Sequence, residues 1–225
     1  MKLKEVQIVT IFVVFTIGIT LGAIVEKSYG IRNILKGNFR RNSPSETTGS
    51  IPQKYQGKLQ LFILAGQSNM AGMGNLPRSQ PKTNPKIYVF GNDYRWKIAK
   101  EPVDDPTNQV DKVSEDIPPG YGPAVDFATT VLKQRPDMVI GLIPCAKGGS
   151  AIHDWQRNLD ENTLYGSCLK RVRAASLMGK VAGILFFQGE IDTVDPKEDP
   201  KRTFSPNQWA NKFTVLVKNW RSDLN

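Results

Sequence analysis

The sequence LFILAGQSNMAG, residues 61–72, decides the fold of this chain. Five mostly apolar residues lead into glycine, glutamine, serine and asparagine, and small residues follow. A short continuous apolar run is typical of a strand that is covered on both faces of a parallel sheet. The abrupt change to glycine and small polar residues predicts a tight turn from this strand into a helix.

Two other segments repeat this pattern: VIGLIPCA (139–146) precedes KGGS, and VAGILFF (181–187) precedes QGE. KIYVF (86–90) is a possible fourth strand. The segments with helical spacing of apolar residues, or with a helix-starting proline, are 123–134, 164–178 and 208–220. This alternation predicts an α/β domain with a parallel sheet and right-handed crossovers. Ligands of such sheets bind beyond the carboxyl ends of the strands, where all three glycine-containing turns fall.

Ser68 lies directly after the first predicted strand. The glycine and alanine around it leave backbone N–H groups uncovered, and such groups can stabilise an oxyanion. Ser68 is therefore a candidate nucleophile, and its neighbours Gln67 and Asn69 are candidate substrate contacts. The simpler interpretation is that Ser68 or Asn69 only caps the following helix. A phosphate-binding loop fits less well, because no GK[ST] follows.

The net charge of +9 over 225 residues is concentrated near the N-terminus. Residues 1–58 carry nine basic and three acidic residues, a net charge of +6. The other 21 basic and 18 acidic residues give residues 59–225 a net charge of only +3. Basic residues around an apolar segment are explained by membrane topology, and no basic stripe interleaved with aromatic residues follows. The charge therefore does not indicate a nucleic-acid-binding protein.

Residues 6–25 form a run of twenty residues without a charge. Twenty helical residues span roughly 30 Å, the thickness of the hydrocarbon core of a bilayer. We therefore predict a single-pass membrane anchor within residues 1–28, with a cleaved signal peptide as the alternative. Basic residues flank the run on both sides, so the positive-inside rule does not decide its orientation. The polar segment up to residue 58 is predicted to be a flexible linker, which makes 29–58 the connection to a globular domain at 59–225.

Cys145 and Cys168 are the only cysteines. Neither lies in a CxxC pair or a Cys/His cluster, so a zinc site is not predicted. A disulfide between them would require a location outside the cytosol and a suitable geometry, and the simpler interpretation is that both are core residues. No metal or organic cofactor is implied by the sequence.

The blocks ILAGQSNMAG, IPCAKGGSAIHDW, LYGSCLKRV and ILFFQGEIDT occur in this order. Together they resemble the sialate O-acetylesterase-related (SASA) domain of carbohydrate esterase family six, within the SGNH-hydrolase superfamily. The resemblance covers about residues 59–225. It implies a three-layer, flavodoxin-like parallel sheet with helices on both faces, and an extracytoplasmic enzyme that acts on acetylated carbohydrate.

The resemblance also implies site residues. Ser68 matches the nucleophile, and its own N–H would contribute to the oxyanion hole. Gly148 and Gly149 match the block that supplies a second backbone donor. Gln188 matches a side-chain oxyanion donor, and Glu190 matches the acid that orients a catalytic histidine. The alternative for Gln188 and Glu190 is hydrogen bonding that ties loops together; Asp192 and Asp195 are interpreted as solvated loop carboxylates rather than metal ligands.

One part of the family pattern is missing. The family's catalytic histidine lies in an Asp-x-x-His block near the C-terminus, and this sequence contains no such block. Its only histidine, His153, lies where the pattern does not place the base. Three explanations are open: the chain is truncated, the histidine comes from another chain, or the domain binds without catalysis. We expect truncation and a fold incomplete at the C-terminus, because a sheet that ends on a crossover helix leaves an uncovered edge.

These observations predict a serine esterase that removes O-acetyl groups from carbohydrate through an acetyl-serine intermediate. Because the Asp-x-x-His block is absent, we do not expect efficient turnover by this chain alone. A non-catalytic, membrane-tethered glycan-binding or scaffold module of the same fold is the alternative. A thioester or lipid esterase also fits Ser68 but not the QGE block. Four aromatic residues could stack on sugars or, more simply, belong to the core: Trp96, Tyr121, Trp155 and Tyr165.

Overall fold

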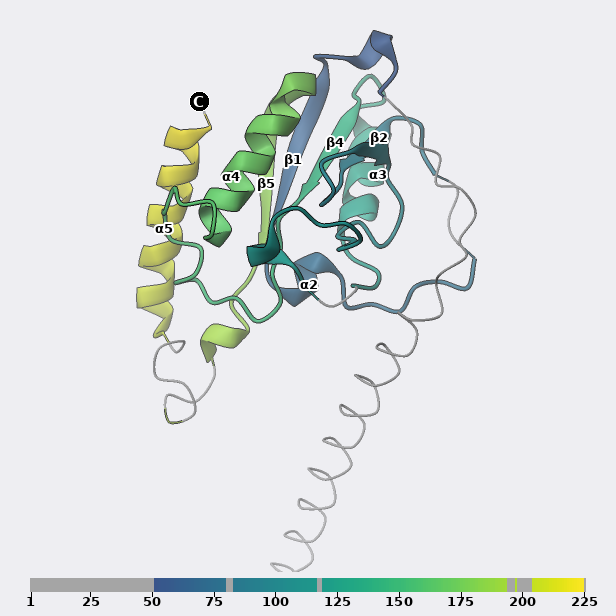
Figure 1. The fold of residues 1–225 in the computed structure, drawn as a ribbon. Helices are drawn as coiled ribbons and strands as arrows, with labels where there is room; N and C mark the ends of the chain where they lie inside the picture. The colour runs from purple at the N-terminus through teal and green to yellow at the C-terminus, as the bar shows by residue number, and fades with distance from the viewer. Residues whose placement is uncertain (1–50, 80–82, 117–118, 194–196, 198–203, 225) are drawn as a thin grey trace, which may run out of the picture. The chain divides into compact units, whose positions relative to one another are not determined.

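The computed structural model describes residues 51–79, 83–116, 119–193, 197 and 204–224 (Figure 1). The predicted membrane anchor at 6–25 lies outside these residues and stays a prediction. Within the part that is described, no helix is both long and apolar enough to cross a membrane.

The predicted flexible linker is wrong in its last eight residues. Residues 51–58 include a short 3-10 helix, η1 (Gln53–Tyr55). Ile51 is only 4% exposed within the core, and the Tyr55 ring makes an edge contact with Tyr88 at a centroid distance of 6.5 Å. Two apolar residues among polar ones show no helical or strand period, so their burial was not visible in the sequence.

The sheet has five strands: β1 (Leu59–Gly66), β2 (Ile87–Phe90), β3 (Trp96–Ile98), β4 (Ile140–Pro144) and β5 (Gly179–Phe187). Their order is β3-β2-β4-β1-β5, and every neighbouring pair is parallel except β2 and β3. The parallel sheet is therefore confirmed. The flavodoxin-like order is wrong in detail, because β1 lies between β4 and β5 instead of next to β2. β3 was not predicted, since its three residues are too few to show a period.

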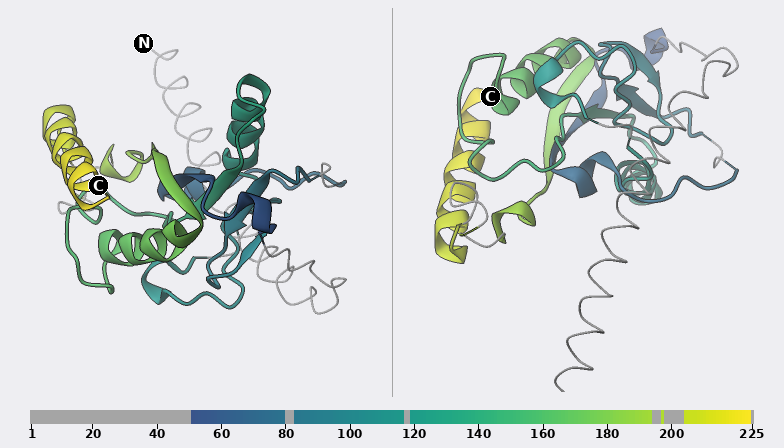
Figure 2. Two further views of the ribbon diagram at one scale, coloured as in Figure 1. Left: turned by 90° about the horizontal axis from the view of Figure 1, so that it is seen from above. Right: turned by 60° about the horizontal axis from the view of Figure 1, so that its bottom comes forward.

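Helices cover both faces of the sheet, as predicted (Figure 2). α3 (Ala124–Gln134) packs on one face, and α4 (Leu164–Ala175) and α5 (Pro206–Asp223) pack on the other. The strand period divides β1 between the two faces: Leu61 and Ile63 belong to the core under α4 and α5, and Leu64 belongs to the core under α3. A Ser205–Gln208 capping box and Pro206 start α5.

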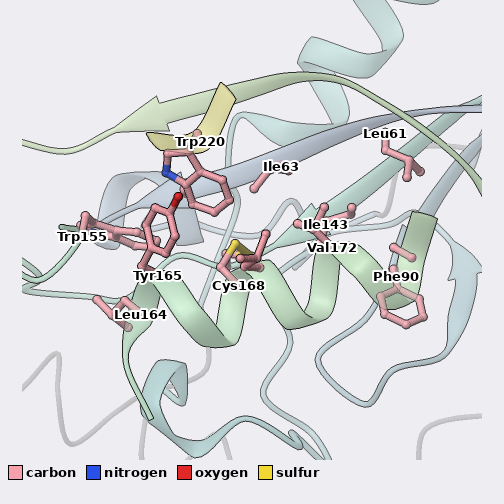
Figure 3. Close-up of a cluster of buried hydrophobic side chains, with 14 of the residues drawn as sticks. Leu61, Ile63, Phe90, Ile143, Trp155, Leu164, Tyr165, Cys168, Val172 and Trp220 are labelled. Atoms are coloured by element: carbon pink, nitrogen blue, oxygen red, sulfur yellow. A yellow bond between two sulfur atoms is a disulfide. The ribbon is translucent and has the colours of Figure 1, made fainter. Parts of the chain in front are cut away.

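The core beneath α4 contains the two cysteines and two of the candidate sugar-stacking residues (Figure 3). Cys145, just after β4, forms a disulfide with Cys168 in α4. Trp155 and Tyr165 are 0% exposed. Their rings pack in the core, so the suggestion that these two stack on sugars is wrong. The core interpretation is confirmed for Trp155 and Tyr165.

β5 forms one edge of the sheet. Beside it, an apolar groove of about 400 Å³ lies between β5 and α5, and Phe187 at the end of the strand is 48% exposed. Among the residues that the structure describes, no strand pairs with the outer edge of β5.

Candidate functional site

The turns that follow β1, β4 and β5 meet at the carboxyl end of the sheet. The Gln67 N–H donates to the Phe187 carbonyl at 2.9 Å, which joins the β1 and β5 turns. The Lys147 N–H and the Ser150 hydroxyl donate to the Gly66 carbonyl at 3.0 and 3.2 Å, which joins the β1 and β4 turns. The predicted convergence of the three glycine-containing segments is therefore confirmed.

Gly66 makes the close approach of these turns possible. Its φ is +138°, a value that favours glycine, and a Cβ at this position would overlap the carbonyl oxygen of Phe187. The chain therefore leaves β1 pressed against the end of β5. This is the local reason for a glycine two residues before the candidate nucleophile.

Ser68 is the first residue of the short helix α2 (Ser68–Ala71) and is half-buried. Gln67 occupies the N-cap position, and no side chain makes a capping hydrogen bond. The interpretation of Ser68 or Asn69 as a helix cap is therefore wrong. Within the described residues, the Ser68 hydroxyl makes no hydrogen bond, so it is available to a substrate.

Glu190 lies beside this serine. It is exposed, and its Oε1 accepts a hydrogen bond from Nδ2 of Asn69, the residue after Ser68. The structure therefore brings Ser68, Asn69 and Glu190 together. It pairs Asn69 with Glu190, so a substrate contact by Asn69 would have to share or replace this bond.

Gln67 and Gln188 are buried, and their side-chain amides bind protein groups. Gln67 Oε1 accepts from the N–H groups of Gly189 and Ile191 at 3.3 and 3.4 Å. Gln188 Nε2 donates to the Ser150 carbonyl at 3.0 Å and to Asp192 at 2.5 Å. The geometry therefore supports the loop-tying alternative for Gln188 and assigns Gln67 the same role. The expected oxyanion contact of Gln188 and the expected substrate contact of Gln67 stay predictions.

Asp192 is not a solvated loop carboxylate, because it is only 2% exposed. The short 3-10 helix η4 (Ile191–Thr193) turns it inward. Its carboxylate accepts the Ile152 N–H at 3.0 Å, the Trp209 indole N–H at 3.2 Å and the Gln188 amide. Asp192 thus joins the β4 turn, the β5 turn and α5. The four-residue interval from Gln188 to Asp192 was the available signal, since one turn of chain brings such residues together.

Asp116 is a second acidic residue that the sequence did not indicate. Its carboxylate accepts the N–H of Gly148, one of the two expected oxyanion donors. The Lys147 ammonium lies 3.9 Å from Asp116 Oδ1 and donates to the Glu115 carbonyl at 2.6 Å. In this conformation, the Gly148 N–H, which the resemblance implies to be an oxyanion donor, is bound to the Asp116 carboxylate. Gly149, with φ +68°, completes the turn.

Two carboxyls in the loop that follows β3 have raised pKa values. Burial raises the pKa of Asp104 to about 6, although its Oδ1 accepts from the Asn92 side chain at 2.7 Å. Burial also raises the pKa of Glu101, whose Oε2 accepts the Gly122 N–H at 3.3 Å. The Gly122 segment supports α2, because the Gly120 N–H donates to the Gly72 carbonyl at 2.7 Å.

A polar cleft of about 560 Å³ opens beside Gly148 and Gly149. His153 lies on its wall and is exposed. In the described part of the chain, no hydrogen bond joins the His153 side chain to Ser68 or to Glu190. The cleft was not predicted, because its wall is an irregular loop (residues 151–163) without periodicity.

Comparison with known proteins identifies the relatives of this fold. The SASA family, described as "carbohydrate esterase, sialic acid-specific acetylesterase", matches residues 58–225. A probable carbohydrate esterase of Arabidopsis thaliana is 34% identical over an aligned length of 187 residues, and the match covers 74% of this chain and 64% of the relative. This chain therefore spans less than two thirds of that protein's length.

Solved structures agree with this relationship. An Arabidopsis thaliana protein has a TM-score of 0.59 and 33% identity over 75% of this chain and 70% of its own. The crystal structure of NanS has a TM-score of 0.51 and 19% identity over 75% of this chain and 64% of its own. The first supports common ancestry, whereas the second supports the fold alone.

Proposed function

The chain belongs to the SASA family of carbohydrate esterases, and we propose that it removes O-acetyl groups from carbohydrate through an acetyl-Ser68 intermediate. The observation that carries this proposal is the hydroxyl of Ser68. It stands at the carboxyl end of the sheet, in a turn where three loops converge, without a hydrogen-bond partner among the described residues. A hydroxyl in this setting can reach an ester carbonyl without first breaking a protein contact.

In the proposed first step, Ser68 Oγ attacks the acetyl carbonyl carbon and gives up its proton to a base. The carbon–oxygen bond to the sugar then breaks, and the sugar oxygen leaves with a proton. In the second step, water attacks the acetyl group and releases acetate and free Ser68. The Ser68 N–H and the Gly148–Gly149 turn are the proposed donors to the tetrahedral oxygen.

The geometry adds a condition to this proposal. The Gly148 N–H already donates to Asp116, and a carboxylate beside a developing oxyanion is electrostatically unfavourable. The Asp116 carboxylate must therefore move away before Gly148 can act as a donor. Glu190 is the proposed acid that orients the base, and its bond to Asn69 holds it next to the nucleophile turn.

The experiment is hydrolysis of p-nitrophenyl acetate, which needs no glycan contact. Ser68→Ala should lower kcat/KM at least about tenfold, because it removes the nucleophile. The loss is smaller than in a complete triad, since this chain contains no Asp-x-x-His block. Ser222→Ala is the matched control, since Ser222 is exposed on α5, and its rate should equal that of the unmodified protein. Equal rates for Ser68→Ala and Ser222→Ala would exclude Ser68 as the nucleophile.

A non-catalytic glycan-binding module is the second candidate. The observation that favours it is the occupied donor: Asp116 holds the Gly148 N–H. Saturable binding of an acetylated oligosaccharide without any release of acetate would support this candidate over the esterase.

We further propose that the domain lies outside the cytoplasm, tethered by residues 6–25. The Cys145–Cys168 disulfide supports this location, because disulfides persist mainly in oxidising compartments. Protease treatment of sealed vesicles tests it: the domain should be digested from the extracytoplasmic side, and digestion only from the cytoplasmic side would refute the proposed location.

A further inference from the structure

The polar cleft beside the β4 turn has the size and lining of a binding site. Its volume of about 560 Å³ lies within the usual range of ligand pockets, about 300–1,000 Å³. Polar residues dominate its wall, including His153, Asp154, Gln156, Arg157, Asn158 and Asn162. This composition suits a ligand with many hydroxyl groups better than an apolar one.

The cleft is connected to the nucleophile turn by direct contacts. Ser150, which lines the cleft, donates its hydroxyl to the Gly66 carbonyl at 3.2 Å. Lys147 lines it too and donates its N–H to the same carbonyl at 3.0 Å. Gly66 is two residues from Ser68. Gly148 and Gly149, the turn proposed to donate to the tetrahedral oxygen, line the cleft as well. A ligand in the cleft therefore lies against a part of the proposed reaction site.

The cations that line the cleft are already balanced by carboxylates. Arg157 makes two hydrogen bonds to Asp223, from Nε at 2.9 Å and from Nη2 at 3.0 Å. Lys147 lies 3.9 Å from Asp116. Asp154 adds a further negative charge to the wall. An acidic sugar would therefore lose hydration without gaining an unbalanced cation among the described lining residues.

The amide side chains of the wall still have hydrogen-bonding capacity. Asn158 uses Oδ1 to accept the Asp160 N–H at 3.0 Å, and Asn162 uses Nδ2 to donate to Asp160 Oδ1 at 3.1 Å. Gln156 uses Nε2 to donate to the Ile152 carbonyl at 2.9 Å. Within the described residues, Asn158 Nδ2, Asn162 Oδ1 and Gln156 Oε1 have no partner. One donor and two acceptors match sugar hydroxyls, which both donate and accept.

We propose that this cleft binds the glycan part of the substrate and selects an uncharged glycan over an acidic one. The inference rests on the proposed esterase function, because it places the sugar beside the Gly148–Gly149 turn. It names a substrate class, a neutral acetylated oligosaccharide, and a specificity surface formed by residues 153–162.

The test measures binding by titration calorimetry in the Ser68→Ala background, so that no ester is consumed. The probes are mono-O-acetylated galactotriose and mono-O-acetylated trigalacturonic acid, which differ only in a hydroxymethyl or carboxylate group on each ring. The neutral probe should bind at least tenfold more tightly. Acetylated sialic acid, the acidic sugar in the family's description, is the third probe and should bind as weakly as the galacturonate.

Asn158→Asp removes the Nδ2 donor, adds a charge and keeps the acceptor for the Asp160 N–H. It should weaken binding of the neutral probe about tenfold, whereas Asn211→Asp, an exposed asparagine on α5, should leave it unchanged. His153→Arg adds a cation to the wall and should strengthen binding of the galacturonate several-fold.

Tighter binding of either acidic probe, equal affinities for Asn158→Asp and Asn211→Asp, or no saturable binding of the neutral probe would each overturn the proposal. The esterase function is assessed separately by p-nitrophenyl acetate, which contains no sugar. Loss of that activity with intact glycan binding would therefore count against the esterase alone.

Discussion

Replacing Asp192 with asparagine tests the buried network that holds the site together. The carboxylate accepts three donors from three parts of the chain: the Ile152 N–H, the Gln188 amide and the Trp209 indole N–H. All three donate to the same oxygen, Oδ2, and the Ile152 N–H also lies 3.2 Å from Oδ1. Asparagine has the same shape, and with its oxygen at the Oδ2 position it keeps all three bonds. Its NH₂ group then takes the Oδ1 position and faces the Ile152 N–H.

The cost comes from the lost charge on the acceptor. A hydrogen bond to a charged group contributes about 1.5–3 kcal/mol, whereas a neutral one contributes about 1 kcal/mol, so each of the three bonds becomes weaker. The contact between the Ile152 N–H and the new NH₂ group places two donors together and adds to the loss. We therefore expect the free energy of unfolding to fall by about 3 kcal/mol.

Thermal unfolding followed by calorimetry measures this loss. For a domain of this size, 1 kcal/mol shifts the midpoint by about 2–4 °C, so Asp192→Asn should lower Tm by about 6–12 °C. Asp137→Asn, an exposed aspartate before β4, is the matched control and should stay within about 0.5 kcal/mol. If Asp192→Asn is as stable as Asp137→Asn, the network does not support the three loops as described.

Three other changes test the surroundings of the site. Asp116→Ala frees the Gly148 N–H and removes a nearby negative charge. The kcat/KM for p-nitrophenyl acetate should therefore rise about tenfold, which equals about 1.4 kcal/mol of activation free energy. A decrease would show that Asp116 positions the turn instead. Burial raises the pKa of Asp104 to about 6, so the folded protein favours the neutral carboxyl. The contribution of this group to the free energy of unfolding is present below about pH 4 and is lost as the pH rises through 6. Asp104→Asn keeps an acceptor for Asn92 and should raise the free energy of unfolding by about 1 kcal/mol at pH 8, a value reduced because the carboxyl is partly exposed. At pH 4 the substitution should have no effect. Denaturant titrations at both pH values measure this difference, and equal effects at both would contradict it. His153→Gln should leave p-nitrophenyl acetate hydrolysis unchanged, since no hydrogen bond joins the described His153 side chain to Ser68; a large loss of kcat would identify His153 as the base.

The regular elements were predictable because each buries a periodic or continuous apolar surface. The strand after residue 59, the strand after 139 and the strand after 179 follow directly from their apolar runs. β3 was not predicted, because its three half-buried residues are too few to show a periodic pattern of apolar residues. The order of the strands was not fixed by the local pattern either, since several orders bury the same faces.

The site was predictable in its location but only partly in its details. Small residues at strand ends correctly indicated that Ser68, the Gly148 turn and Glu190 belong to one edge of the sheet. Which polar side chains are buried was not visible, because burial of Asp192 depends on partners from distant segments. The contact of Asp116 with Gly148 likewise joins residues 32 positions apart, without a local signal.

The most direct measurement of the central claim is mass spectrometry of the protein quenched in acid during turnover of p-nitrophenyl acetate. An acetyl group should be found on the peptide that contains Ser68, and it should be absent from the Ser68→Ala protein. Acetate release without this adduct, or an adduct on another residue that survives in Ser68→Ala, would contradict the acetyl-serine mechanism.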